Sequence, residues 1–149
     1  MELKEYLLGY CKDFVEGRLK MLKDRMSSIR ESLLNETKST AGDKHETGRA
    51  MLQLEREKIG KQIAENLKLN ETLSRVNIDS RKPNIVLGSV IYTKEANYFI
   101  AISAGKITFE DDTYFAIAPS SPIGRLMLGK KEGEEIEFNA RKIRIEKVN

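Results

Sequence analysis

The chain has 149 residues, of which 40% are hydrophobic and 33% are charged, and its formal net charge is +3. This length predicts one or two small domains, and the high charged fraction favours an elongated, solvated protein over one with a large compact core. The sequence has no apolar run of about 18 residues and does not begin like a secretory signal, so we expect no membrane segment. Its single cysteine, Cys11, excludes a disulfide framework and fits a reducing cytoplasm. We also expect the protein to be a monomer.

The first half of the sequence has the pattern of two long helices. Residues 3–38 contain no proline, and their apolar residues recur at steps of three or four, which is typical of one apolar helical stripe. This stripe comprises Leu8, Cys11, Val15, Leu19, Leu22, Met26, Ile29 and Leu33. A second helix is predicted from about residue 44 to 76, with a thinner stripe made of Leu52, Ile59, Ile63, Leu67 and Leu73. Polar residues such as Asn66 interrupt the second stripe, and the short polar segment between the helices predicts an antiparallel hairpin about 50 Å long.

The segment between the helices, about residues 39–46, carries two carboxylates three residues apart, Asp43 and Glu46. Gly42 is predicted to break the first helix, and Asp43 is predicted to cap the second. Asp-x-x-Glu at a helix start is close to a capping box, which needs no function. The functional alternative is that the two carboxylates share one Mg²⁺ whose remaining ligands come from another molecule. His45 lies between them and is expected to be exposed.

The second half of the sequence is predicted to be a small β domain. Pro83 and several turn-forming residues make residues 79–84 a linker, which leaves residues 1–78 for the hairpin and 85–149 for the β domain. Short segments rich in β-branched and aromatic residues predict strands over 85–92, 97–103, 106–110, 113–118, 134–138 and 142–148. A short helix is predicted over 122–128. We expect a strongly bent antiparallel sheet packed on that helix, and therefore an α+β fold.

No self-contained catalytic or metal site is predicted from the sequence. Cys11 and His45 would lie about 50 Å apart at opposite ends of the hairpin, so they cannot form a nucleophile–base pair. One cysteine and one histidine cannot build a closed zinc site, and no glycine-rich phosphate-binding loop is present. We therefore expect that the protein is not an enzyme by itself.

Basic residues of the first helix repeat at heptad spacing. Arg18 and Arg25 are seven residues apart, as are Lys23 and Arg30, so each pair lies along one helix face. Such rows are usually solvated and paired with acidic residues. The functional alternative is that they guide the hairpin along a nucleic acid or a charged channel.

Two stretches of the sequence resemble the Gre family (GreA/GreB) of bacterial transcript-cleavage factors. Residues 42–46, Gly-Asp-Lys-His-Glu, are similar to the Gly-Asp-x-x-Glu-Asn tip of that family. Residues 121–133 are similar to its C-terminal Ser-Pro-Ile-Gly/Ala-Arg-Ala-Leu-x-Gly-Lys signature. The order of long hairpin, linker and small FKBP-like β domain also matches over nearly the whole chain. The asparagine and the aromatic residue of the family's Glu-Asn-Ala-Glu-Tyr continuation are absent here, where Thr47, Gly48, Arg49 and Ala50 follow Glu46.

The resemblance implies a transcription elongation factor that binds RNA polymerase, inserts its hairpin into the secondary channel and stimulates cleavage of backtracked RNA near its 3′ end. On this interpretation Asp43 and Glu46 are the catalytic residues, and they hold a second Mg²⁺ that is supplied in the polymerase active centre. The resemblance also implies RNA or channel contacts for Arg18, Lys23, Arg25 and Arg30, and polymerase docking for Ser121, Pro122, Ile123, Gly124 and Arg125. Two alternatives stay open: a channel-binding polymerase regulator without cleavage activity, and an FKBP-like protein-binding or chaperone module.

Overall fold

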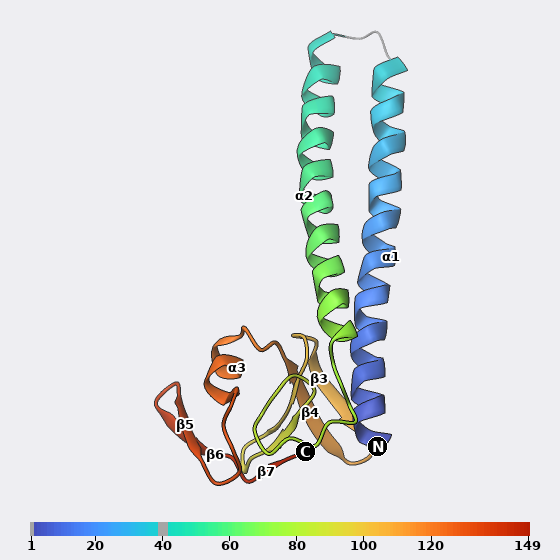
Figure 1. Cartoon of the computed structure of the whole chain (residues 1–149). Coiled ribbons are helices and arrows are strands. Elements are labelled where there is room, and N and C mark those ends of the chain that lie inside the picture. The colour runs from blue at the N-terminus through green and yellow to red at the C-terminus, as the bar shows by residue number, and fades with distance from the viewer. Residues whose placement is uncertain (1, 39–41) are drawn as a thin grey trace. The chain divides into compact units, whose positions relative to one another are not determined.

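The computed structural model describes residues 2–38 and 42–149, and for residues 37, 38 and 42–45 it describes only the backbone (Figure 1). Two long helices, α1 (Glu2–Lys38) and α2 (Gly42–Ser74), precede a small β domain that contains one short helix. This confirms the predicted α+β class. The chain divides into two compact units: the hairpin unit, Val15–Asn70, and the β unit, which comprises Met1–Phe14 and Glu71–Asn149. The domain limits predicted near residues 78 and 85 stay a prediction, because α1 and α2 each run through both units.

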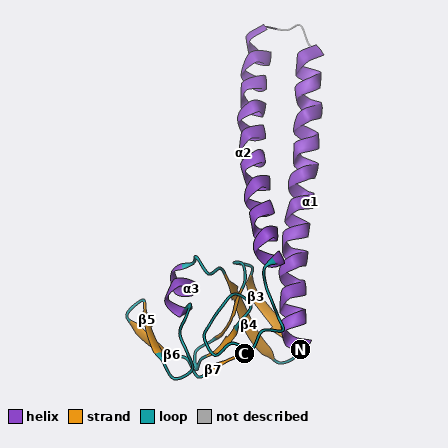
Figure 2. Cartoon of the chain, in the orientation of Figure 1, coloured by secondary structure: helices purple, strands orange, loops and turns teal. Residues whose placement is uncertain are grey.

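In the hairpin unit, α1 and α2 run antiparallel, side by side (Figure 2). Their contact is made by the apolar stripes, and its core is Leu22, Ile29 and Leu33 of α1 with Ile59 of α2. The burial of these side chains stabilises the pair, since long isolated helices gain most of their stability from packing an apolar face. The predicted stripe of α1 is therefore confirmed at its centre.

The predicted apolar stripe of α2 is wrong at one position, Leu67. Leu67 was expected to face α1, but its side chain is 50% exposed, whereas the neighbouring Asn66 is only 3% exposed. Ile59, Asn66 and Leu73 are seven residues apart and share one helix face. Leu67 lies about 100° further round the helix, so it points away from the contact.

The predicted start of α2 also differs from the structure. The helix begins at Gly42, so Gly42 belongs to α2 instead of ending α1, and Asp43 lies inside the first turn instead of at the N-cap position. The remainder of the predicted tip, residues 39–41, lies outside the described residues.

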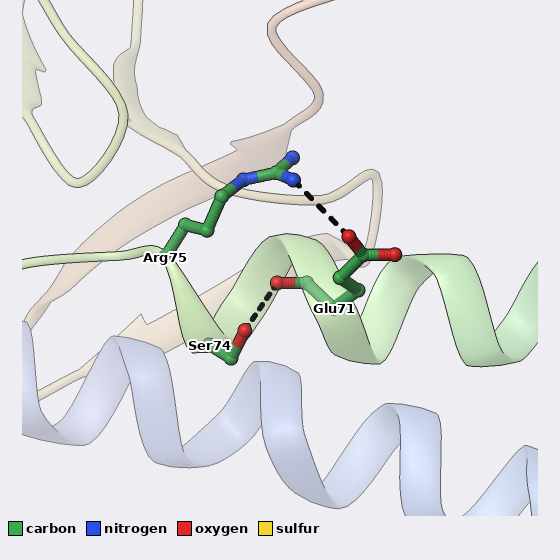
Figure 3. A network of polar contacts seen from close by, with 3 residues as sticks. All are labelled: Glu71, Ser74 and Arg75. Atoms are coloured by element: carbon green, nitrogen blue, oxygen red, sulfur yellow. Dashed lines mark hydrogen bonds and ion pairs between the residues drawn. The ribbon is translucent and has the colours of Figure 1, made fainter.

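At its other end, α2 stops at Ser74, where nearby side-chain and backbone groups contact the last turn of the helix (Figure 3). The Ser74 hydroxyl donates to the Glu71 carbonyl at 2.5 Å, and the Arg75 guanidinium lies 3.6 Å from the Glu71 carboxylate. The Val76 N–H donates to the Leu73 carbonyl at 3.2 Å. These contacts satisfy carbonyls that a helix end leaves without partners, and a cation next to a helix C-terminus is favourable.

The β unit contains two sheets where the sequence predicted one. The first has the strand order β3-β4-β2-β1-β7, and the second pairs β5 with β6. The strands are β1 (Val90–Tyr92), β2 (Asn97–Ile100), β3 (Gly105–Phe109), β4 (Asp112–Ile117), β5 (Glu135–Phe138), β6 (Arg141–Arg144) and β7 (Lys147–Val148). The expectation of a wholly antiparallel sheet is wrong for β2 and β4, which pair in parallel with Asn97 opposite Tyr114. The chain reaches this arrangement because β4 lies between β2 and β3. It pairs with β2 on one side and forms an antiparallel hairpin with β3 on the other.

Two of the predicted strands, over 85–92 and 142–148, are interrupted by hydrogen bonds and a turn. The segment predicted from residue 85 becomes a strand only at Val90, because Gly88 has a φ of +95° and the Ser89 hydroxyl accepts the Val86 N–H at 2.9 Å, which bends the chain. The segment predicted over 142–148 is divided into β6 and β7. Between them, the Ile145 N–H donates to Glu134 beside β5, and the Glu146 N–H donates to Tyr92 of β1. The chain thus changes from one sheet to the other within two residues.

One buried cluster of the β unit includes residues of both sheets and of α3 (Pro122–Met127): Ile85, Ile91, Ile100, Met127, Ile136, Ile143 and Ile145. The first turns of α1 belong to the same unit. The Tyr6 ring packs on Phe109 with 4.9 Å between centroids, and Cys11 is completely buried. Burial raises the pKa of the Cys11 thiol to about 11, although a hydrogen bond with the Ile102 backbone acts in the opposite direction. The prediction that Cys11 is a small core residue is confirmed. No helix in residues 2–38 and 42–149 is long and apolar enough to cross a membrane.

Candidate functional site

The two tip carboxylates are only partly described by the structure. Glu46 is exposed in the first turns of α2, and the backbone of Asp43 is helical, three residues before it. Residues three apart in a helix lie on one face, so both positions are on the same side of α2. The side chains of Asp43 and His45 lie outside the described residues, and their predicted roles stay predictions.

Oxygen ligands of this kind fit Mg²⁺, which proteins usually hold through one or two carboxylates while water and phosphate oxygens fill the other positions. In the described part of the chain, no three His, Cys, Asp or Glu side chains come together as a metal-binding group. Two carboxylates would make up a partial ligand set for Mg²⁺, with the other positions filled from another molecule.

Glu36 of α1 brings a further carboxylate close to the start of α2. Its Oε1 lies 3.6 Å from the position that a Cβ would occupy on Gly48, and Oε2 lies 3.9 Å from it. Glu36 therefore lies against the backbone of α2 at Gly48. A larger residue than glycine at position 48 would contact this carboxylate directly.

The four basic residues predicted to contact RNA or a channel are all exposed, but they do not form one group. Arg25 lies 3.9 Å from the carboxylate of Glu55 on α2, in an ion pair whose side chains are about half exposed. Such a pair contributes little to stability in water, yet it offsets the charge of Arg25. Arg18, Lys23 and Arg30 are exposed on α1.

Arg30 belongs to a basic hollow that crosses both helices. The hollow measures about 330 Å³ and is lined by Arg30, Leu33 and Leu34 of α1 and by Arg49, Gln53 and Arg56 of α2. Among the described residues, its lining includes three guanidinium-bearing side chains beside an apolar patch. Guanidinium groups bind phosphate and carboxylate groups in bidentate geometry.

Arg49 and Arg56 were missed as candidate residues by the sequence analysis. Their seven-residue spacing was the available signal, because it places them on one face of α2. What could not be read directly was the alignment of the helices. The contacts Arg25–Glu55 and Glu36–Gly48 show that Arg30 lies opposite the part of α2 between Arg49 and Arg56.

The predicted docking segment forms the start of α3, where three of its five residues have clear structural roles. Ser121 is the N-cap: its Oγ accepts the Gly124 N–H at 3.1 Å and donates to the Ala118 carbonyl at 2.7 Å. Pro122 occupies the first helical turn, where its missing N–H costs nothing. At Gly124, a Cβ would lie 2.2 Å from the Ala118 carbonyl oxygen, so only glycine fits.

The other two residues of the segment differ in exposure. Ile123 packs partly against the core of the β unit, whereas Arg125 is exposed. Leu126 and Leu128, next to Arg125, are 39% and 38% exposed. Arg125 with these leucines is therefore the part of the segment that is available to a partner.

Among the comparisons with known proteins, matches are found with solved structures. No family model matches the sequence, and no curated protein matches it. A solved structure described as "Structure of the transcription factor Gfh1" is 20% identical, with 92% of this chain and 90% of that chain covered, at a TM-score of 0.36. A likeness of this size carries no argument about function.

Proposed function

We propose that this protein is a transcription elongation factor that binds RNA polymerase and stimulates cleavage of backtracked RNA. The observation that carries the proposal is the long antiparallel hairpin with Gly-Asp-Lys-His-Glu at the start of α2, together with the Ser-Pro-Ile-Gly-Arg segment that caps α3. Helices of 37 and 33 residues reach about 50 Å at 1.5 Å per residue. Such a length is suited to carrying the tip into a narrow channel, and it greatly exceeds that of an average globular helix.

In the proposed mechanism, Asp43 and Glu46 contribute carboxylate oxygens inside the polymerase active centre. They would hold a Mg²⁺ there that, when bound, supplies charge stabilisation for phosphodiester hydrolysis. The carboxylates also accept hydrogen bonds from water and can thereby orient a water molecule towards the scissile phosphate. The protein would supply ligands and orientation, while the polymerase supplies the remainder of the catalytic centre.

The basic hollow would bind the displaced RNA. The phosphates of single-stranded RNA carry one negative charge per nucleotide, and Arg30, Arg49 and Arg56 present three cations within one hollow. Arg18 and Lys23 of α1 would add weaker contacts with RNA or the channel wall. Arg25 would contribute from within its ion pair with Glu55. Arg125, supported by the capped turn of α3, would contact the polymerase surface.

A cleavage assay tests this proposal. A stalled, backtracked elongation complex with 3′-labelled RNA is incubated with Mg²⁺ and either the protein or its Asp43→Ala/Glu46→Ala variant. The matched control is Glu57→Ala/Glu65→Ala, which removes two exposed carboxylates from elsewhere on α2. Release of short 3′ fragments with the protein and the control, but not with the tip variant, supports the proposal.

One observation favours a second candidate function, a polymerase regulator that enters the channel without stimulating cleavage. Gly48 weakens the start of α2 by up to about 1 kcal/mol relative to alanine, and the Glu36 carboxylate lies beside it. Binding to polymerase with no fragment released by any variant would select this candidate.

A further inference from the structure

The outer edge of β6 is a surface that the proposed function does not use. β5 and β6 are joined by Asn139 and Ala140, whose φ angles of 51° and 62° define a two-residue type I′ turn. In such a hairpin the closing pair, here Phe138 and Arg141, exchanges backbone hydrogen bonds, and every second pair along the strands does the same.

This alternation determines where the backbone groups of β6 point. The Ile145 N–H donates to the Glu134 carbonyl at 2.9 Å, as the alternation requires. The N–H and C=O groups of Lys142 and Arg144 therefore point away from β5. Within residues 2–38 and 42–149, no strand pairs with this edge, and no backbone hydrogen bond reaches it from elsewhere.

The chain beyond β6 indicates where an added strand would run. The N–H groups at positions 142, 144 and 146 lie on the same side of the chain. The N–H of Glu146 donates to the Tyr92 carbonyl at the end of β1, at 2.9 Å. A strand added to β6 would therefore lie in line with β1. After Tyr92, the last residue of β1, the chain turns away, and this turn is closed by the hydrogen bond from the Thr93 N–H to the Ala96 carbonyl.

A hollow of about 620 Å³ occupies this position. It is lined by Lys94 and Glu95 of the turn after β1, by Glu132 and Gly133, and by residues 142 and 144–146. The free backbone edge and the hollow thus lie together, in the space that a longer β1 would have filled.

The charges along β6 indicate which kind of segment fits. Arg141, Lys142 and Arg144 are exposed, and on the β5 side Glu137 lies opposite Lys142 while Glu135 lies opposite Arg144. A second copy that paired through the same edge would place cations opposite cations, which is destabilising. A strand with carboxylates at alternate positions would place them opposite Lys142 and Arg144 on the open side of β6, as β5 places Glu137 and Glu135 on the other side.

We propose that the outer edge of β6 binds an extended acidic segment of a partner protein as an added β-strand. The backbone of Lys142 and Arg144 forms the hydrogen bonds, and their side chains select carboxylates at alternate positions of the bound segment. The hollow is lined by Glu95, Glu132 and Glu146 as well as by cations, so it receives an uncharged part of the segment, beyond the carboxylates that Lys142 and Arg144 bind. This site shares no residue with the hairpin tip or with α3.

The same cations can be interpreted in a second way, because basic residues on an edge strand also discourage strand pairing with other proteins. A test must therefore detect backbone pairing as well as charge attraction. The probe is a fluorescein-labelled Glu-Val-Glu-Val-Glu-Val peptide, titrated with the full chain at low ionic strength and followed by fluorescence anisotropy. An N-methylated version of the peptide keeps the charges but loses backbone hydrogen bonds.

We expect the Lys142→Glu/Arg144→Glu variant to bind the peptide at least about tenfold more weakly than the unmodified chain. The control Lys82→Glu/Lys106→Glu makes the same change of charge at two exposed positions of the β unit that do not line the hollow, and it should bind normally. The N-methylated peptide should bind at least about tenfold more weakly, and amide exchange at Lys142 and Arg144 should slow on addition of the unmodified peptide.

The proposal is overturned if the peptide does not bind, if both peptides bind equally, or if the two charge variants weaken binding to the same extent. It is also overturned if a labelled single-stranded RNA binds this edge and displaces the peptide. Circular dichroism of the variants checks that each is folded before it is compared.

Discussion

Asn66 of α2 donates a hydrogen bond from Nδ2 to the main-chain carbonyl of Val15 on α1, at 2.8 Å, inside the helix contact. Both residues are buried, and they are 51 positions apart in the sequence. A single polar side chain in an otherwise apolar seam can satisfy its hydrogen bond in only one alignment of the helices. The Asn66–Val15 bond therefore sets the register of the hairpin, and with it the positions of Arg30, Arg49 and Arg56 across the two helices.

Replacement of Asn66 by alanine should destabilise the hairpin. The variant loses a buried hydrogen bond and leaves a small cavity, so the free energy of unfolding should fall by about 1–2 kcal/mol. Urea denaturation followed by circular dichroism measures the change. Asn70→Ala, at an exposed position one turn further on, should cost less than about 0.5 kcal/mol. Equal losses for the two variants would contradict the role given to Asn66.

Removal of the basic hollow should weaken the engagement of RNA. The variant Arg30→Gln/Arg49→Gln/Arg56→Gln should lower the rate of transcript cleavage at moderate salt by about tenfold or more, because three phosphate-binding cations are lost. The rate should also become less dependent on salt concentration. Cleavage rates at several ionic strengths, measured on the same backtracked complex, provide the check.

A matched variant separates a local effect of the hollow from that of total charge. Lys12→Gln/Lys20→Gln/Lys61→Gln removes the same number of cations from exposed positions that do not line the hollow. Its cleavage rate should stay within about twofold of the unmodified protein. A comparable loss in both triple variants would mean that overall charge, and not the hollow, attracts the RNA.

Gly124→Ala should disturb the start of α3. The added Cβ would meet the Ala118 carbonyl oxygen at 2.2 Å, so the backbone must shift, at a cost of about 1–3 kcal/mol. By contrast, Gly17→Ala should raise stability by about 0.5–1 kcal/mol, because nothing lies within 4 Å of that Cβ position and alanine is the better helix former. Thermal unfolding of both variants tests these opposite signs, and a stable Gly124→Ala protein would refute the close contact.

The buried thiol of Cys11 should make stability depend on pH in the alkaline range. Burial raises the folded-state pKa from 9.0 to about 11, so the folded chain holds this proton more tightly than the unfolded chain. The contribution is fully present below about pH 9 and is lost as the pH rises towards 11, for a maximum of about 2–3 kcal/mol. Urea unfolding at several pH values should therefore show a steeper alkaline loss for the unmodified protein than for Cys11→Ala. Parallel curves would show that the thiol does not contribute.

The sequence was sufficient to predict the helical hairpin, because sustained apolar spacing without proline leaves few alternatives to long helices. The α3 segment was equally predictable from Ser121, Pro122 and the glycine that follows the helix. The strand pairing was less predictable, since a parallel β2–β4 pair and the division of 142–148 between two sheets depend on contacts distant in sequence. Local propensity describes a segment, but it does not choose the segment's partner.

The candidate site was predictable only where its signal lay within one element. Arg30 was found from heptad spacing on α1, whereas its grouping with Arg49 and Arg56 required the register that Asn66 sets. The spacing of apolar residues predicted that Leu67 faces α1. In the structure Asn66 is buried there instead, and Leu67 is exposed. A buried asparagine with a hydrogen-bond partner cannot be distinguished in the sequence from an exposed one.

The most direct test of the proposed function measures polymerase binding and RNA cleavage on the same backtracked complex. The Asp43→Ala/Glu46→Ala variant should bind polymerase with the affinity of the unmodified protein but release no 3′ fragments above the intrinsic rate of the polymerase. The unmodified protein should release them, and its activity should depend on Mg²⁺ concentration. Fragment release that is unchanged in the tip variant, or a failure of the unmodified protein to bind polymerase, would contradict the proposal.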